Sequence, residues 1–299
     1  YKDVLMPGYT HLQVAMPSSF GLWFGAYAEA LCDDLQLMLA AWRITNRNPL
    51  GSAAGYGSSF PLNRQMTTDL LGFDSMNYNV VYAQMGRGKM ERIVATALGG
   101  VAATLSKMAF DVCLYNSQNF GFVKLPKEYT TGSSIMPHKK NPDVFELIRA
   151  KCNKIQAAPQ EIMMVANNLP SGYFRDLQII KEIFIPLFGE LRQSLEMTLQ
   201  IVQKIEVNKA ILDNNCYDLM FSVEEVNRLA LEGVPFRDAY KQVGIAIEKG
   251  EFVPQKTINH THEGSMGNLC NEKIAELKTA VLKEFTFEKA EKAERDLVK

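Results

Sequence analysis

Long runs of helix-forming residues constrain this chain more than any other feature of its sequence. The first run is rich in Ala, Leu and Met and has no internal proline after its opening residue, Pro17. Four such runs are predicted to form helices, at about residues 17–48, 88–119, 142–168 and 180–205. No stretch shows the convincing alternation of apolar and polar residues that is typical of strands. The sequence therefore predicts an all-α protein.

These helices are too long and too apolar for a single small core. At ~1.5 Å per residue, helices of roughly 25 to 30 residues span about 40 Å. Pro186 predicts a kink or a restart in the last of them. Because apolar residues crowd most faces, other surfaces must cover them, and further subunits are the simplest cover. We therefore expect a bundle of long helices that takes part in an oligomer.

The pattern changes after about residue 215, where shorter helices with clear boundaries are predicted. In the stretch SVEEVNRLALEGVP, Ser222 and Glu225 predict a capping box, Gly233 lies at the expected end, and Pro235 prevents continuation. We therefore predict two domains, a central helical-bundle domain over residues 1–215 and a smaller C-terminal helical domain over residues 216–299.

Composition limits the possible partners. The chain has 299 residues, 47% of them apolar, and a formal net charge of -1 with both signs mixed along its length. That balance favours a small molecule or another subunit as partner, and argues against nucleic acid or a membrane surface. Five scattered cysteines without a CxxC pair favour reduced thiols over a disulfide or zinc framework.

The N-terminal residues bear on the compartment. They resemble neither a signal nor a transit peptide, and no uninterrupted apolar run reaches the ~18 residues of a membrane span. We expect a cytoplasmic protein. Because the sequence begins without Met and without an obvious helix start, we also expect it to be a piece of a longer chain.

The stretch TTGSSIMPHKKNPDVFELIRAK, residues 130–151, places a polar loop before an apolar helical run. Asn141 is predicted as the N-cap, Pro142 suits the first helical position, and Asp143 complements the helix dipole. A helix N-terminus beside Lys139, Lys140 and two hydroxyls could bind a carboxylate. The alternative, an ordinary solvated turn between helices, remains open on composition alone.

Histidines are scarce: besides His138, in the stretch 130–151, there are only His11, His260 and His262. His11 lies between Pro7 and Pro17, and a lone histidine in a loop is more often a surface or capping residue than a catalyst. His260 and His262, in the stretch NHTHEGSMGN, hint at a metal site. Because the spacing supplies no third ligand, we favour a polar turn there.

Two further polar stretches are less specific. Residues 51–60, GSAAGYGSSF, resemble a phosphate-binding loop but lack its preceding strand and lysine, so a bend between helices is the favoured interpretation. Residues 170–181 contain Tyr173 and Arg175 and, if helical after Asp176, place Gln178 and Lys181 on one face. An ordinary solvated helix start is the alternative.

Together these motifs resemble a known family. GSSIMPHKKNP is similar to the signature of the fumarase and aspartase superfamily, and PDVFELIRAK, PGYTHLQVAMP and YFRDLQIIK resemble the argininosuccinate lyase family in particular. The resemblance extends from Met6 to about residue 270. It implies cleavage of argininosuccinate to arginine and fumarate by β-elimination, without metal or organic cofactor. It also implies a homotetramer with active sites shared between subunits, and a further domain N-terminal to His11.

The resemblance also assigns roles to individual residues. Ser133 matches the serine that takes the proton from the substrate's Cβ, His11 and Glu146 match the pair that moves a proton to the leaving nitrogen, and Lys139 matches the lysine that stabilises the carbanion intermediate. The matching substrate-binding positions are Thr10, Ser134, Asn141, Tyr173, Arg175, Gln178 and Lys181. Arg175 stands where many family members have lysine.

The implied chemistry explains these residue types. Removing a proton beside a carboxylate creates an aci-carboxylate, which preorganised cations and donors must stabilise. Serine is a poor base at neutral pH, so Ser133 needs positive surroundings and the exclusion of water. Two alternatives stay open, a sister lyase such as adenylosuccinate lyase and a catalytically silent structural homologue like the lens crystallins.

Overall fold

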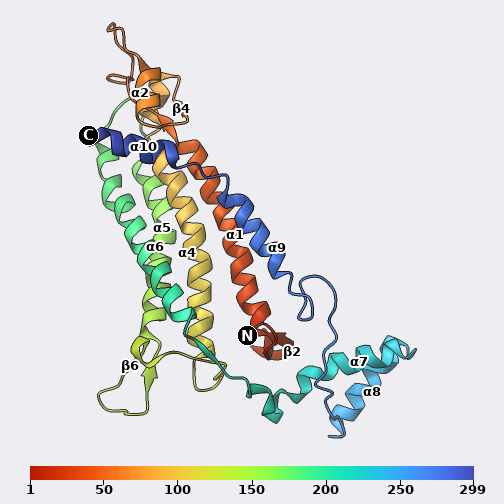
Figure 1. The fold of residues 1–299 in the computed structure, drawn as a ribbon. Helices are drawn as coiled ribbons and strands as arrows, with labels where there is room; N and C mark the ends of the chain where they lie inside the picture. Colours follow the sequence, from red (N-terminus) through yellow and green to blue (C-terminus); the bar gives the residue numbers. More distant parts are fainter. The chain divides into compact units, whose positions relative to one another are not determined.

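The structure is a computed structural model that describes residues 1–299, and α-helices dominate it (Figure 1). The ten α-helices are α1 (Phe20–Thr45), α2 (Arg64–Leu70), α3 (Val80–Met85), α4 (Lys89–Tyr115), α5 (Asp143–Val165), α6 (Ile180–Val202), α7 (Ser222–Leu231), α8 (Phe236–Glu248), α9 (Asn271–Leu282) and α10 (Glu288–Leu297). The predicted all-α class is confirmed.

The strands are short and form only two-stranded sheets. They are β1 (Leu5–Thr10), β2 (Gln13–Ser19), β3 (Arg47–Asn48), β4 (Ser75–Met76), β5 (Val123–Lys124), β6 (Thr131–Gly132), β7 (Lys140–Asn141) and β8 (Glu206–Val207). The pairs β1–β2, β5–β8 and β6–β7 are antiparallel, and β3–β4 is parallel.

The chain divides into two compact units, each built from separate stretches of sequence. Unit 1 comprises residues 1–28, 114–126 and 204–274, and unit 2 comprises residues 29–113, 127–203 and 275–299. The boundary predicted at residues 215 and 216 falls inside unit 1. The division into domains 1–215 and 216–299 stays a prediction about the sequence.

Unit 2 is a bundle in which α4, α5 and α6 lie side by side (Figure 1). Polar contacts tie α4 to its neighbours: the Thr104 hydroxyl donates to Asp34 Oδ2 of α1 at 2.6 Å, and the Ser106 hydroxyl donates to Asn153 Oδ1 of α5 at 2.7 Å. Glycine at position 100 of α4 allows close approach, because a Cβ there would lie 3.0 Å from Asp34 Oδ1.

The apolar face of α5 explains why this helix packs in the bundle. Its buried residues recur at helical spacing. Burial of each large apolar side chain among them contributes roughly 1.5–3 kcal/mol to stability. They are Phe145, Ile148, Cys152, Ile155, Ala158 and Ile162. Lys154 of α5 also forms an ion pair of 2.7 Å with Glu190 of α6.

The C-terminal segment of unit 2 packs against α1 and α2. The Trp42 ring of α1 lies 5.9 Å, centroid to centroid, from both Phe285 and Phe287. Gly72, just after α2, has φ +73°, and a Cβ on it would lie 2.4 Å from the carbonyl oxygen of Lys289. The backbone of α10 therefore lies directly against the backbone at Gly72.

Unit 1 is held by two groups of apolar residues. Aromatic rings from three stretches of sequence cluster in contact with Phe122, whose ring lies 6.0 Å from Tyr9, 5.1 Å from Tyr115 and 6.2 Å from Tyr217. The helix pair α7 and α8 has a small core of its own, made of Val226, Ala239 and Val243 with partly buried neighbours.

The four long helices begin and end within a few residues of the predicted positions. α6 continues through Pro186, which stands in its second turn, as α5 continues through Pro159. The capping box predicted at Ser222 and Glu225 is wrong: Phe221 is the N-cap of α7, and Ser222 is already helical. A 3-10 helix over Asn215–Phe221 leads directly into α7, so Ser222 never has the extended backbone that a cap requires.

The hairpin β1–β2 was not expected from the sequence. Its register pairs Pro7 with Pro17 and shifts between Pro7 and Tyr9, and neither strand alternates buried and exposed residues. Because the register shift interrupts the alternation of side chains, the usual period-two signal is absent, and the prolines argued against a strand. The turn residues His11 and Leu12 have φ values of 54° and 57°.

α4 is the one helix that meets the length and hydropathy criteria for a membrane span, criteria that buried core helices also meet. Half of its most apolar window is buried inside the protein.

Candidate active site

The loop Ser133–Lys139 is the connection of a small hairpin in unit 2. β6 and β7 pair with Thr131 opposite Asn141 and Gly132 opposite Lys140. The loop is largely exposed, and the Ile135 side chain is 83% exposed. The hairpin therefore fixes both ends of a loop whose middle is largely exposed.

The Ser133 hydroxyl organises the start of this loop. Its Oγ accepts hydrogen bonds from the amides of Ile135 at 3.3 Å and Met136 at 3.1 Å. The amide of Lys139 in turn donates to the carbonyl of Met136 at 3.0 Å. Ser134 and Lys139 are exposed on the same loop.

The start of α5 differs from the prediction by one residue. Pro142 is the N-cap, not Asn141, and Asp143 is the first helical residue. Because Asn141 belongs to β7, its side chain is directed across the hairpin, where Nδ2 donates to Thr131 Oγ1 at 3.5 Å. Thr131 Oγ1 also donates a short hydrogen bond to Asp143 Oδ2. Asp143 Oδ1 is buried without a hydrogen-bond partner.

Glu146 lies in the first turn of α5, and its side chain is exposed. Its neighbourhood includes the Cys113 thiol at the end of α4. Burial raises the pKa of Cys113 to about 11, with Arg149 lowering it and Glu146 raising it further. The Arg149 guanidinium lies over the Phe110 ring, 5.7 Å from the ring centroid. The first two turns of α5 thus expose charged groups beside α4.

The second polar segment of unit 2 runs from Ser171 to Lys181. Arg175–Gln178 form a 3-10 helix, and α6 begins at Ile180. The side chains of Tyr173, Arg175, Gln178 and Lys181 are all exposed. Gln178 Nε2 donates a short hydrogen bond to the Tyr173 hydroxyl.

Thr10 and His11 lie in unit 1, whereas the other candidate residues lie in unit 2. Thr10 ends β1 opposite Gln13, and the His11 side chain is exposed at the turn of the hairpin. Unit 2 brings Asn141 next to the Ser133 loop and joins Tyr173 to Gln178.

The other stretches noted in the sequence have local partners. His260 Nε2 lies 2.9 Å from Glu224 Oε1 at the start of α7, and the His260 and His262 rings stack 6.2 Å apart. In residues 1–299 no group of three or more His, Cys, Asp or Glu side chains is arranged to hold a metal ion. In residues 51–60 three glycines, Gly51, Gly55 and Gly57, have positive φ, which fits a bending segment.

Two contacts near the site were not predicted from the sequence. Thr131 and Asp143 connect the hairpin to α5, and the TTG and NPD stretches that contain them gave only a weak signal for this contact. The Arg87 guanidinium lies over the Tyr173 ring, 5.8 Å from its centroid. No sequence spacing relates positions 87 and 173, so only the fold reveals this pair.

Comparison with known proteins identifies the class first. A family model described as "Lyase" matches residues 1–157. The chain is 72% identical over 298 residues to an argininosuccinate lyase of Parabacteroides distasonis, a match that covers 100% of this chain and 67% of that protein. It is 70% identical over 298 residues to an argininosuccinate lyase of Phocaeicola vulgatus, again covering 100% of this chain and 67% of the relative.

A solved structure supports the same fold. An EDDS lyase variant with bound fumarate superposes with a TM-score of 0.80 at 20% sequence identity, covering 99% of this chain and 68% of that one. This chain belongs to the argininosuccinate lyase family, and it is a lyase.

Proposed function

We propose that this protein cleaves argininosuccinate to arginine and fumarate by β-elimination. The observation that carries the proposal is the 72% identity, over 298 residues, to a protein named argininosuccinate lyase. The exposed Ser133 loop in front of the α5 N-terminus is consistent with the proposal, because this reaction needs a base and cationic or donor groups close together.

Ser133 is the proposed base that removes the proton from the Cβ of the substrate. The amides of Ile135 and Met136 already donate to its Oγ. Hydrogen bonds from amides favour the negatively charged form of an oxygen. They would therefore help Ser133 to act as an alkoxide once the loop closes over the substrate and excludes water.

Lys139, Ser134 and Asn141 are proposed to bind the carboxylate on which negative charge develops. Lys139 supplies a cation, and Ser134 and Asn141 supply donors, at the end of the hairpin that leads into α5. Stabilisation of developing charge by preorganised donors is commonly the largest single contribution to such a rate.

His11 and Glu146 are proposed to move a proton toward the leaving nitrogen. The arginine product leaves through a guanidinium nitrogen, which needs little acid assistance, so we assign them a modest part in the rate. Thr10 is proposed to bind substrate beside His11. The remaining substrate-binding residues are proposed to be Tyr173, Arg175, Gln178 and Lys181.

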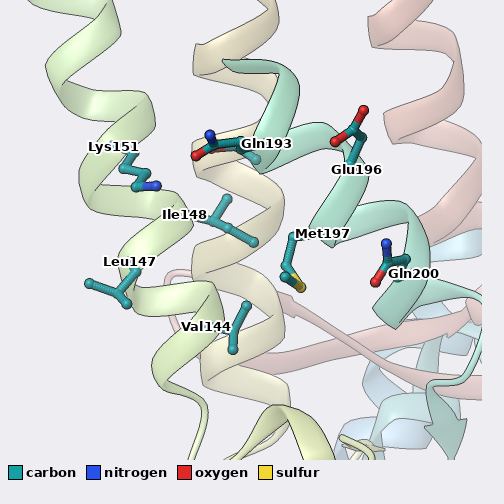
Figure 2. A pocket seen from close by; sticks show the side chains of 9 residues that line it. Val144, Leu147, Ile148, Lys151, Gln193, Glu196, Met197 and Gln200 are labelled. Carbon is teal, nitrogen blue, oxygen red and sulfur yellow. The ribbon is translucent and has the colours of Figure 1, made fainter. Parts of the chain in front are cut away.

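We further propose a homotetramer with active sites shared between subunits. Between α5 and α6 a groove of about 420 Å³ is lined by both apolar and polar side chains, Leu147 among them, with Val144 and Ile148 directed toward Met197 (Figure 2). Leu147 is 62% exposed and Leu199, further along α6, is 60% exposed. Apolar helix faces of this kind are typical of subunit interfaces. The resemblance also supports a cytoplasmic enzyme.

The test is the release of fumarate, followed by its ultraviolet absorbance, from argininosuccinate and in parallel from adenylosuccinate. We expect release only from argininosuccinate by the full-length protein. Release from adenylosuccinate instead would transfer the proposal to the sister lyase. No release from either, by a folded and correctly assembled protein, would favour the silent structural homologue.

A further inference from the structure

The corner between α3 and α4 packs closely against the segment that carries Tyr173. Gly88 has φ +80°, and a Cβ on it would lie 2.8 Å from the Ala166 side chain. The Ser171 hydroxyl contacts Met85 Sδ at 3.8 Å. The backbone of this corner is therefore fixed relative to residues 166–177.

Arg87 stands at this corner and is half-buried. Its guanidinium lies 5.8 Å from the centroid of the Tyr173 ring, within the range of an attractive cation–π contact. At the hydroxyl of the same side chain, Gln178 Nε2 donates to the Tyr173 oxygen. The Tyr173 side chain is thus held at its ring by a cation and at its hydroxyl by an amide.

The segment that carries this ring borders a cavity. Tyr173 is 47% exposed. The residues on either side of it, Gly172 and Phe174, line a cavity of about 310 Å³ together with Arg87. Gly172 has φ +120°, a conformation that L side chains rarely adopt. Because the ring is half-exposed and its segment borders a cavity, the contacts with Arg87 and Gln178 restrain it where packing does not cover it.

We propose that Arg87 is a positioning residue that fixes the Tyr173 ring, so that the Tyr173 hydroxyl and Gln178 are presented to the substrate in one geometry. The inference rests on the proposed function, which makes Tyr173 and Gln178 substrate-binding residues. Arg87 acts through Tyr173 and needs no contact with substrate itself. Its loss should therefore weaken binding of substrate more than it slows the chemical step.

Steady-state kinetics of fumarate release by the full-length enzyme provide the first test. A cation–π contact at a partly exposed site contributes about 1 kcal/mol, which corresponds to a roughly fivefold rise in KM for Arg87→Met. We expect kcat to change less than about twofold, and Arg87→Lys, which keeps the cation, to retain most of the affinity. A wild-type KM in Arg87→Met, or a loss confined to kcat, would overturn the proposal.

A matched control lies two residues away. Lys89 Nζ is 5.3 Å from the centroid of the Tyr82 ring, a similar cation–aromatic contact on the same stretch of chain. Lys89→Met should leave KM unchanged. An equal rise of KM in Lys89→Met and Arg87→Met would show a general effect of lost positive charge and would overturn the assignment to Arg87.

A double-mutant cycle tests whether Arg87 acts through the Tyr173 hydroxyl. Tyr173→Phe removes that hydroxyl, so adding Arg87→Met to Tyr173→Phe should raise KM little further. If the two substitutions instead raised KM by independent factors that multiply in the double variant, the proposal would be contradicted.

A measurement that does not depend on enzyme activity separates the inference from the proposed function. Fluorotyrosine at position 173 should give a narrow ¹⁹F resonance in the wild-type enzyme and a shifted or broadened one in Arg87→Met, while a label at Tyr82 stays unchanged. An unchanged resonance at position 173 would overturn the inference even in an active enzyme. If the wild-type enzyme released no fumarate from argininosuccinate, the proposed function would fail, and the resonance would still decide whether Arg87 holds the ring.

Discussion

At the scale of single residues, Ser133 is the position on which the proposed chemistry depends most. Its Oγ is the only atom of the loop assigned the role of base, and two amides donate to it. We expect Ser133→Ala to lower kcat by ~10³-fold, the middle of the range for loss of a positioned acid or base, with assembly and Tm unchanged. Stopped-assay measurement of fumarate release checks this.

A matched serine provides the control. Ser58 Oγ accepts a hydrogen bond from the Phe60 amide at 3.1 Å, the same kind of local turn that Ser133 makes. Ser58→Ala should keep the wild-type kcat. An active Ser133→Ala enzyme would falsify the assignment of the base.

Arg175 tests the binding of substrate at the start of α6. The guanidinium can contact a carboxylate through two hydrogen bonds, whereas an ammonium cannot. Arg175→Lys should therefore raise KM about fivefold, equivalent to ~1 kcal/mol, with kcat little changed. If KM is unchanged, Arg175 lies on a solvated face without a part in binding.

At this scale the sequence predicted residue types better than contacts. Ser133, Lys139 and Asn141 were predicted as one loop, and the structure places them on one hairpin. The capping role of Asn141 was wrong, because pairing with Thr131 in the hairpin takes precedence over a local cap. The contact of Arg87 with Tyr173 depends on tertiary packing and has no local signal.

At the scale of elements, the packing of α10 on Gly72 can be tested directly. A Cβ at position 72 would meet the Lys289 carbonyl at 2.4 Å, and the residue has φ +73°. Gly72→Ala should lower the free energy of unfolding by about 1–3 kcal/mol through backbone strain and displacement of α10. Thermal unfolding measures the change.

A substitution at Gly121 separates the cost of backbone strain from the cost of displacing α10. It has φ +61°, but a Cβ added to it would have no other atom within 4 Å. Gly121→Ala should therefore show the cost of strain alone, and a smaller loss than Gly72→Ala. Equal losses would mean that the contact with α10 contributes nothing.

Elements were predictable where one helix face is apolar over many turns. The buried residues of α5 recur from Phe145 to Ile162 in a helix of 23 residues, so its period is unambiguous. The hairpin β1–β2 was missed because Pro7 pairs with Pro17 and its register is interrupted. Strands of two residues, such as β6 and β7, are too short to show any period.

At the scale of the whole molecule, the exposed apolar faces of α5 and α6 predict assembly. Leu199→Glu places a charge on one such face, and burying an unpaired charge in an interface is costly. We expect this variant to dissociate into smaller species in light scattering while it keeps its helical circular dichroism.

The corresponding control is Leu231→Glu on α7, where the side chain is 90% exposed but belongs to unit 1. It should leave the molar mass unchanged. Dissociation of Leu231→Glu, with an intact assembly of Leu199→Glu, would place the interface on α7 instead of on α6.

The packing of the C-terminal segment against α1 and α2 also affects how the chain folds during its synthesis. The Trp42 ring packs on Phe285 and Phe287, and Asp74 forms an ion pair of 3.1 Å with Lys289, so partners are separated by more than two hundred positions in the chain. Contacts this distant in sequence form late, because loop closure must precede them. During translation, the apolar surface of α1 and α2 stays uncovered until residues 275–299 have left the ribosome. The surface around Trp42 is therefore the part of this bundle that stays exposed longest while the chain is made.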